Sequence, residues 1–257
     1  MTVRLRDIVS FLDTTLETGR FRDYGPNGLQ VEGRQEVDRV ITGVSANLAL
    51  FEAAVQREAD LVVVHHGLIW GSGIRTVTGS MASRLAMLLG NGISLCGYHL
   101  PLDAHPRLGN NVGLCDAIGL GLERETFGDV RGHALGMAGS WHEPLPRDQA
   151  ITRIARGVGC DPMRFVFPHG PEMVRRVGLC TGAASDLLED AAHAGCDIYL
   201  TGELAERAGE LARELQITLI AAGHHATEVF GPQRVARELA RTFAGLDVQF
   251  VDVPSPL

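Results

Sequence analysis

Two phrases of this sequence each place a histidine and a carboxylate four residues apart, directly after a short apolar run. They are His99-Leu-Pro-Leu-Asp103 and His224-His-Ala-Thr-Glu228, and the pair His65-His66 adds two more imidazoles. Imidazole nitrogen together with carboxylate oxygen suits zinc, iron, manganese or cobalt better than calcium or magnesium, and a carboxylate can bridge two cations. The residue types therefore predict a site for two metal ions, and a protein that gathers them is predicted to be hydrolytic.

The sequence also repeats itself at one long period. Laid without gaps on residues 174–197, residues 37–60 give eight identities in 24 positions. The first half then carries about twelve extra residues after Leu68, beyond which the two phrases match, histidine on histidine and carboxylate on carboxylate. Similarity at one long period predicts that a supersecondary unit was duplicated.

Apolar periodicity predicts the same succession of elements in each half. In the first half we expect helices at 5–17, 48–58, 82–89 and 113–118, and strands at 28–32, 39–44, 60–64 and 92–97. In the second half we expect helices at 148–156, 185–194, 204–215 and 230–243, and strands at 163–167, 176–181, 197–201 and 217–222. Two further strand-like segments, 133–138 and 247–251, follow the last helix of a half and are candidates to tie the halves together.

Alternating strands and helices predict the α/β class, with mixed, mostly parallel sheets packed between helices. We expect two intertwined repeats of an α-β-(β-α)3 unit, residues 1–130 and 131–257, which can also count as one domain. No low-complexity linker separates the halves, and residues 128–132 and 143–147 are only turn-rich.

The candidate ligands lie where open α/β sheets hold their chemistry, at the carboxyl ends of predicted parallel strands. Consecutive residues of a strand point to opposite sides, so His65 and His66 can reach different partners, for instance one metal each. The turn Thr201-Gly202-Glu203 takes the place of this pair in the second half. Glu203 is therefore either an acid lining the site or a helix-start carboxylate stabilised by the helix dipole. Ordinary structural roles are assigned by default to the other histidines, His105, His133, His142, His169, His193 and His225.

Composition describes a soluble protein of enzyme size. The 257 residues are 45 % hydrophobic, and a formal charge of −8 without a basic run argues against a nucleic-acid surface. The N-terminal residues form a charged amphipathic pattern, so we expect neither a signal peptide nor a membrane span. Five scattered cysteines without a CxxC motif predict reduced, buried thiols and a cytoplasmic location.

Several phrases along the chain carry a family resemblance. They are Asn27-Gly-Leu-Gln30, Val64-His-His-Gly67, Tyr98-His-Leu-Pro-Leu-Asp-Ala-His105 with Leu108-Gly-Asn-Asn111, Thr201-Gly-Glu203, and Gly223-His-His-Ala-Thr-Glu228. In combination they resemble the GTP cyclohydrolase I type 2-like family, the NGG-one-interacting-factor-three-like proteins, and most closely its bacterial YbgI branch. The resemblance runs from the first helix to the C-terminus, without the large insert that longer members carry between the halves.

The resemblance implies two intertwined α/β repeats that assemble into a homohexameric ring, with metal sites facing an inner cavity. It implies a dinuclear centre of two divalent transition-metal ions (Zn, Fe or Mn), with Glu228 as the bridge. The implied ligands are His65, His66, Asp103, His224 and Glu228. His99 is a further ligand, as its match to His224 suggests, or a proton-transfer or supporting residue, which is our assignment, or a structural loop residue.

The resemblance also implies a reaction. Two bound cations lower the pKa of a water from about 15.7 to near neutrality and stabilise an oxyanion. With GTP as the small-molecule substrate, the activated water would attack carbon 8 of guanine, and formate would leave as an acid protonates the ring nitrogen. The candidate acids are His99, Glu203 and His225, in falling order. No Gly-rich phosphate loop is present, so the nucleotide rests on the resemblance alone.

Two alternatives stay open beside this hydrolase. One is a metal-dependent hydrolase of a phosphoester or an amide, and the other is a non-catalytic ring that handles metal or binds a partner. Neither a membrane nor nucleic acid is an expected partner. Catalysis is favoured because the sequence offers more ionisable groups than metal binding needs.

Overall fold

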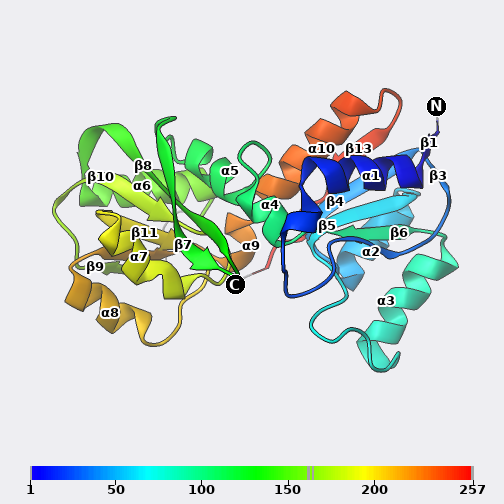
Figure 1. Cartoon of the computed structure of the whole chain (residues 1–257), viewed down its shortest axis with the longest axis horizontal. Coiled ribbons are helices and arrows are strands. Elements are labelled where there is room, and N and C mark those ends of the chain that lie inside the picture. The colour runs from blue at the N-terminus through cyan, green and yellow to red at the C-terminus, as the bar shows by residue number, and fades with distance from the viewer. Residues whose placement is uncertain (1, 161–162, 164, 256–257) are drawn as a thin grey trace. The chain divides into compact units, whose positions relative to one another are not determined.

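The computed structural model describes residues 2–160, 163 and 165–255, and the chain forms two compact units (Figure 1). The first unit holds the residues up to 108 together with 231–253, and the second holds 109–230. These units differ from the predicted halves, because residues 109–130 lie in the second unit and 231–253 lie in the first. The intertwined repeats and their boundary at 130/131 stay predictions.

The first unit contains a five-stranded sheet in the order β13-β4-β5-β6-β2. Its strands are β2 (Gly28–Val31), β4 (Arg39–Ser45), β5 (Leu61–His66), β6 (Ser94–Gly97) and β13 (Asp247–Phe250). Strands β13, β4, β5 and β6 are parallel, and β2 is antiparallel to β6 at the edge. The C-terminal strand predicted at 247–251 thus joins the sheet of the first half. A separate antiparallel pair is formed by β1 (Val3–Arg4) and β3 (Glu36–Val37).

Helices cover both faces of this sheet, with α1 (Leu5–Thr15) and α10 (Phe230–Thr242) on one face and α2 (Leu48–Gln56) and α3 (Gly79–Gly90) on the other (Figure 1). The side chains of β5 alternate between them. Leu61 and Val63 belong to the core under α1 and α10, whereas Val62 and Val64 belong to the core under α2 and α3. A parallel strand that is buried on both faces needs such an unbroken apolar run. The apolar run ends at His65, the first of the two candidate ligands on this strand.

The second unit contains a six-stranded sheet in the order β7-β8-β10-β11-β12-β9. Its strands are β7 (Arg124–Val130), β8 (His133–Pro146), β9 (Phe165–Pro168), β10 (Met173–Leu179), β11 (Ile198–Thr201) and β12 (Thr218–Ala221). Strands β10, β11 and β12 are parallel, while β8 and β9 flank them in the antiparallel sense. Its helices are α5 (Asn110–Ala117), α6 (Arg147–Val158), α7 (Leu188–His193) and α8 (Ala208–Leu215). Helices α5 and α6 share one apolar core with alternate residues of the parallel strands.

Two segments expected to be turns are strand instead. Strands β7 and β8 form a hairpin around Arg131 and Gly132, which have φ of 55° and 87°, and β8 continues to Pro146. Only this two-residue turn is left of the turn expected at 128–132. The polar composition of β7 gives no apolar pattern from which a strand could be predicted. Its backbone hydrogen bonds are made with β8. The strand expected at 163–167 begins at Phe165, and Arg164 lies outside the described residues.

In each sheet, an aspartate just before a central parallel strand forms hydrogen bonds with the backbone of the neighbouring strand. The carboxylate of Asp60 accepts hydrogen bonds from the backbone N–H groups of Asp38 and Arg39, at 2.9 and 3.1 Å. The carboxylate of Asp197 accepts the same two bonds from Arg175 and Arg176, at 2.8 and 2.9 Å. The aligned aspartates of the sequence repeat thus make the same contact in the two units. Within the described part of the chain, no helix combines the length and apolarity needed to cross a bilayer.

Candidate metal centre

The last two residues of β5 carry adjacent imidazoles. The buried His65 has its Nδ1 3.0 Å from the carbonyl oxygen of Tyr98, and its Nε2 lies 3.5 Å from Oδ1 of Asp103. The half-buried His66 has its Nδ1 3.0 Å from the hydroxyl of Ser45, which ends the neighbouring strand β4. Ser45 belongs to strand β4 and Tyr98 follows strand β6, the two strands that flank β5 in the sheet. The rings themselves stay close, with centroids 4.5 Å apart.

The next strand end adds His99 and Asp103. Strand β6 stops at Gly97, and the short helix α4 (Leu100–Ala104) starts after His99, with Pro101 in its first turn. One helical turn separates the two residues, which places both on the same side of the chain. The ring of His99 lies 5.1 Å from that of His65 and 5.7 Å from that of His66. Nitrogen atoms of the three imidazoles all lie within 4.8 Å of one another, close enough to share a metal ion.

A residue that the sequence did not single out holds His99 in place. Asp23 accepts a 2.7 Å hydrogen bond from Nδ1 of His99, and its side chain is only 1 % exposed. It also accepts bonds from Asn27 and from the backbone N–H of Leu100. Burial raises the pKa of this carboxyl, but the hydrogen bonds and charge of His99, with the other donors, outweigh burial and lower it to about 2. Asp23 is therefore a fixed anion behind the imidazole.

The second unit gathers one histidine between two carboxylates. His224 begins the single turn α9 (His224–Thr227), and its Nε2 lies 3.2 Å from Oε2 of Glu228. Its Nδ1 lies 2.6 Å from Oε1 of Glu203, in the turn after β11. Burial lowers the pKa of His224, but hydrogen bonds and charge from Glu228 and Glu203 outweigh it and raise the pKa to about 9. Glu203 thus contacts His224, and it lies before helix α8, which begins only at Ala208.

Gly182 leaves room for the buried carboxylate of Glu228. A Cβ atom at this position would lie 2.3 Å from Oε1 of Glu228 and 3.2 Å from Nε2 of His224. Its φ of 68° is also one that residues with a side chain rarely adopt. The carbonyl oxygen of Gly182 accepts hydrogen bonds from the backbone of Gly202 and Glu203. One glycine therefore packs against both carboxylate-bearing segments.

The histidines share an arrangement that suits metal binding. Nδ1 of His65, His99 and His224 faces an oxygen that can only accept a hydrogen bond, and Nδ1 of His66 faces a hydroxyl that can do so. A neutral imidazole that donates its Nδ1–H keeps the lone pair on Nε2, and His224, whose pKa is raised to about 9, would release a proton on binding a metal. Ligand histidines in proteins are oriented in this way by an acceptor behind the ring. The donor set therefore fits divalent transition metals, and the partners behind each ring could not be found by spacing alone.

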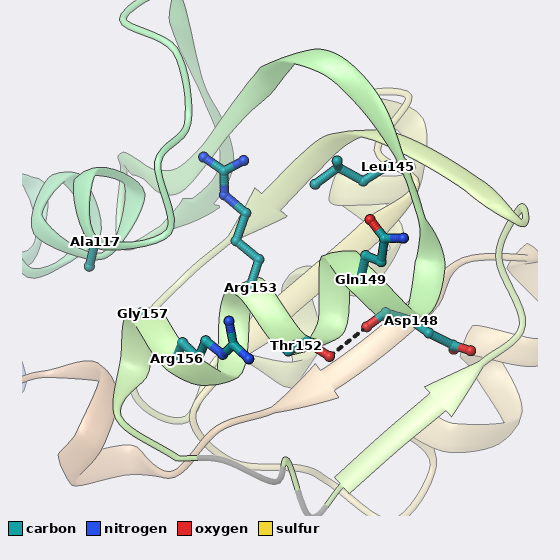
Figure 2. Close-up of a pocket in the computed structure, with 8 residues that line it drawn as sticks. All are labelled: Ala117, Leu145, Asp148, Gln149, Thr152, Arg153, Arg156 and Gly157. Atoms are coloured by element: carbon teal, nitrogen blue, oxygen red, sulfur yellow. Dashed lines mark hydrogen bonds between the residues drawn. The ribbon is translucent and has the colours of Figure 1, made fainter.

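The remaining candidates lie apart from this chemistry or beside it. His225 follows His224 on α9 and is half-buried. His105 is structural, as assumed, because its Nδ1 accepts hydrogen bonds from the backbone of Arg107 and Leu108. A wider pocket of about 760 Å³ lies over α6, where the charged ends of Arg153, Arg156 and Asp148 point apart (Figure 2). None of its lining residues is a predicted ligand.

The similarity to known proteins extends over almost the whole chain. Residues 3–256 match the model of the family Duf34/NIF3 (NGG1p interacting factor 3). The chain belongs to this family. The predicted family is thereby confirmed, and the fold and the histidine–carboxylate groups described above are those of a NIF3 family member.

Two relatives and two solved structures show how close the likeness is. A Pseudomonas aeruginosa protein named GTP cyclohydrolase 1 type 2 homolog is 41 % identical over 257 residues, covering 100 % of both chains. A Yersinia pestis protein of the same name is 41 % identical over 253 residues, covering 97 % of this chain and 98 % of that protein. The structure of protein ybgI, described as of unknown function, is 38 % identical with a TM-score of 0.91, covering 99 % of this chain and 100 % of that one. A structure from Thermus thermophilus is 33 % identical with a TM-score of 0.84, at the same coverage.

Proposed function

We propose that this NIF3 family protein is a hydrolase that depends on two divalent transition-metal ions. The proposed ligands are those that the family resemblance implies, with Glu228 as the bridging carboxylate: His65, His66, Asp103, His224 and Glu228. One observation carries the proposal. In each unit an imidazole Nε2 lies close to a carboxylate oxygen, 3.5 Å between His65 and Asp103 and 3.2 Å between His224 and Glu228, while Nδ1 is engaged behind the ring.

Two ions bound there would lower the pKa of a water and stabilise the oxyanion that forms on the substrate. The protein's own residues supply orientation and protons. Tyr98 and Ser45 fix the rings of His65 and His66, and Glu203 fixes the ring of His224. We assign His99 to proton transfer at Nε2, because Asp23 engages its Nδ1 and its side chain is 20 % exposed, so solvent reaches it.

For the substrate we propose a purine nucleotide, with GTP as the first candidate. The support is the name of the relatives, GTP cyclohydrolase 1 type 2 homolog. Release of formate from carbon 8 of guanine consumes two waters: the first opens the imidazole ring to a formamide, and the second cleaves that formamide. A ring nitrogen must gain a proton as the first carbon–nitrogen bond breaks. His99 is the residue that we propose to deliver it, with Glu203 as the next candidate.

Formate release from GTP tests the proposal directly. Protein freed of metal with a chelator, then reloaded with zinc, iron or manganese, is incubated with GTP, and formate is measured. We expect release only after reloading, and loss of release in His65→Ala. His142→Ala is the matched control, because that side chain is 96 % exposed and lies far along β8 from the ligands in its own unit.

The outcomes separate the competing functions. Two ions per chain without formate, but with cleavage of a phosphoester or an amide, would keep the metal centre and reject the purine substrate. Two ions without turnover of any of these substrates would favour metal handling or partner binding. A stoichiometry at or below one ion per chain would reject the dinuclear centre itself. The homohexameric ring stays a prediction, to be tested by light scattering.

A further inference from the structure

The loop after β5 brings an exposed tryptophan to the histidines of the first unit. Trp70 lies in the stretch that the first half has in excess of the second. Its indole centroid is 5.1 Å from the ring of His99 and 6.0 Å from that of His66. The indole and the ring of His99 are nearly perpendicular, at 84°. Trp70 nevertheless remains 39 % exposed, so a large apolar surface faces solvent beside the proposed proton donor.

The position of this indole is fixed by hydrogen bonds. The indole N–H donates to the carbonyl oxygen of Gly67 at 2.9 Å. The side-chain oxygen of Gln30 accepts from the backbone N–H groups of Leu68 and Ile69, at 2.8 and 3.2 Å. These bonds hold the three residues that precede Trp70. A binding surface gains affinity from being preorganised in this way.

A second aromatic residue is held beside the first. The backbone N–H of Gly71 donates to the carbonyl oxygen of Tyr24 at 2.7 Å. The close approach needs Gly25, because a Cβ atom there would lie 2.3 Å from the carbonyl oxygen of Ile69. The ring of Tyr24 lies 5.9 Å from that of His99, and the residue is 44 % exposed. Two aromatic rings, carried by two joined loops, therefore flank one imidazole.

We propose that Trp70, flanked by Tyr24, is the stacking surface for a planar heteroaromatic ring, so that the substrate class is a nucleobase derivative. The inference rests on the proposed function and deepens it. The crevice lined by His65, His99 and Trp70 holds only about 10 Å³, room for roughly one water. A base does not fit inside this crevice, so we place it on the exposed face of the indole, next to the imidazole of His99. A phosphoester or an amide without a ring gains nothing from this surface.

Binding measurements test the stacking surface apart from any turnover. Zinc-loaded protein is titrated by calorimetry with guanosine, which has the base without phosphate, and with ribose 5-phosphate, which lacks the base. We expect Trp70→Ala to weaken guanosine binding about tenfold, the scale of one base–aromatic stack, and Trp70→Phe to keep most of it. Ribose 5-phosphate should be indifferent to both changes. Phe165→Ala is the control, an aromatic residue 58 % exposed on an edge strand of the second unit.

Several results would overturn the proposal. They are no saturable guanosine binding to the unmodified protein, equal guanosine affinity in Trp70→Ala, or an equal loss of ribose 5-phosphate affinity. A changed mass in light scattering with unchanged guanosine affinity would make the patch a contact between copies of the chain. Zinc content and thermal unfolding are measured for each variant, and Trp70→Phe keeps the test decisive if Trp70→Ala does not fold.

The experiments distinguish failure of the stacking surface from failure of the proposed reaction. Guanosine binding that depends on Trp70 without any formate release would support the stacking surface and reject the cyclohydrolase reaction. Formate release from GTP with an unchanged KM in Trp70→Ala would support the reaction and reject the stacking surface.

Discussion

The first unit holds its donor groups mainly with neutral partners, whereas the second holds its histidine between two acids. His65 and His66 are backed by a carbonyl oxygen and a hydroxyl, but His224 lies between Glu203 and Glu228. The acids raise the pKa of His224 to about 9 against the effect of burial. A nitrogen-rich set and an acid-rich set differ in affinity for a cation. The two units therefore present unlike surroundings to their candidate metal ligands.

In both units a carboxylate is hydrogen-bonded to a candidate histidine, but the two carboxylates differ in their exposure to solvent. A carboxylate engages Nδ1 of the aligned histidines, Asp23 behind His99 at 2.7 Å and Glu203 behind His224 at 2.6 Å. The side chain of Asp23 is 1 % exposed and that of Glu203 is 48 % exposed. Solvent screens the exposed pair of Glu203 and His224. The electrostatic interaction should therefore be stronger in the buried pair of Asp23 and His99.

The largest effect should come from the carboxylates of the two phrases. Glu228→Gln should lower metal occupancy at both positions, because an amide cannot bridge two cations as a carboxylate does. Asp103→Asn should mainly empty one position. Elemental analysis of metal-saturated protein measures both. If the two substitutions remove the same single ion, Glu228 is not a bridge and the acid-rich set serves one metal only.

Removal of the imidazole in front of Asp23 should have the next largest effect. His99→Ala should keep both metals and lower formate release about a hundredfold, the usual scale for losing general acid–base help. If His99 is a ligand instead, metal affinity should fall first, and activity should return with excess metal. Full metal content with full activity would leave His99 a structural residue.

The carboxylates behind the aligned histidines sharpen the comparison. Asp23→Asn should lower formate release more than Glu203→Gln does, because the exposed carboxylate is screened by water. Both variants should be compared with Glu189→Gln, a carboxylate on α7 away from the two histidines. Equal losses in Asp23→Asn and Glu203→Gln would mean that burial does not distinguish the two pairs.

Residue types and spacing were enough to predict the histidines at the strand ends. They did not predict the residues that form hydrogen bonds with those histidines. The apolar runs before His65, His99 and His224 predicted strands β5, β6 and β12, because buried parallel strands leave an unbroken hydrophobic signature. Asp23 left no such signature. It lies in an irregular segment before β2 and reaches His99 only through the fold. Sequence order cannot show that contact, nor the acceptors supplied by Tyr98 and Ser45.

Strand β7 shows the same limit in the fold itself. Its residues Arg124–Val130 are all exposed or half-buried, without regular alternation, and three of them carry charge, so a local pattern gives little sign of a strand. The segment pairs along its length with β8. Whether such a segment forms a strand depends on the strand with which it pairs, and a single sequence does not identify that partner. Spacing already set His65, His66, His99 and His224 apart from most of the other histidines, and the family resemblance added which of them are expected to bind metal.

A glycine comparison within the second unit should give a smaller effect on metal binding. Gly182→Ala should lower metal affinity about tenfold, because the new Cβ would lie 2.3 Å from the carboxylate of Glu228. Gly195→Ala is the matched control: its φ of 72° resembles the 68° of Gly182, but nothing lies within 4 Å of its Cβ position. Both should lose about 1 kcal/mol of stability from the left-handed conformation. Equal metal affinity in the two variants would show that Glu228 does not depend on the space at Gly182.

The smallest effect should come from the two aspartates that fasten the sheets. Asn in place of Asp60 or Asp197 can still accept from two backbone N–H groups, but without charge, so each substitution should cost about 1–2 kcal/mol. Asp60 also accepts a 2.9 Å bond from Arg34, whose side chain is 55 % exposed, and such a pair adds only about 0.5 kcal/mol. Urea denaturation should therefore give nearly equal losses.

The two tryptophans allow each unit to be followed in that experiment. Trp141 is buried in the second unit, so its fluorescence in a Trp70→Phe background reports on the unit that contains Asp197. Trp70 reports in turn on the unit that contains Asp60 when Trp141 is replaced by Phe. A loss confined to one aspartate would mean that the aligned residues keep the same hydrogen bonds without the same contribution to stability. Equal losses would show that the two aspartates contribute equally to the stability of their sheets, although the candidate ligands of the two units have different partners.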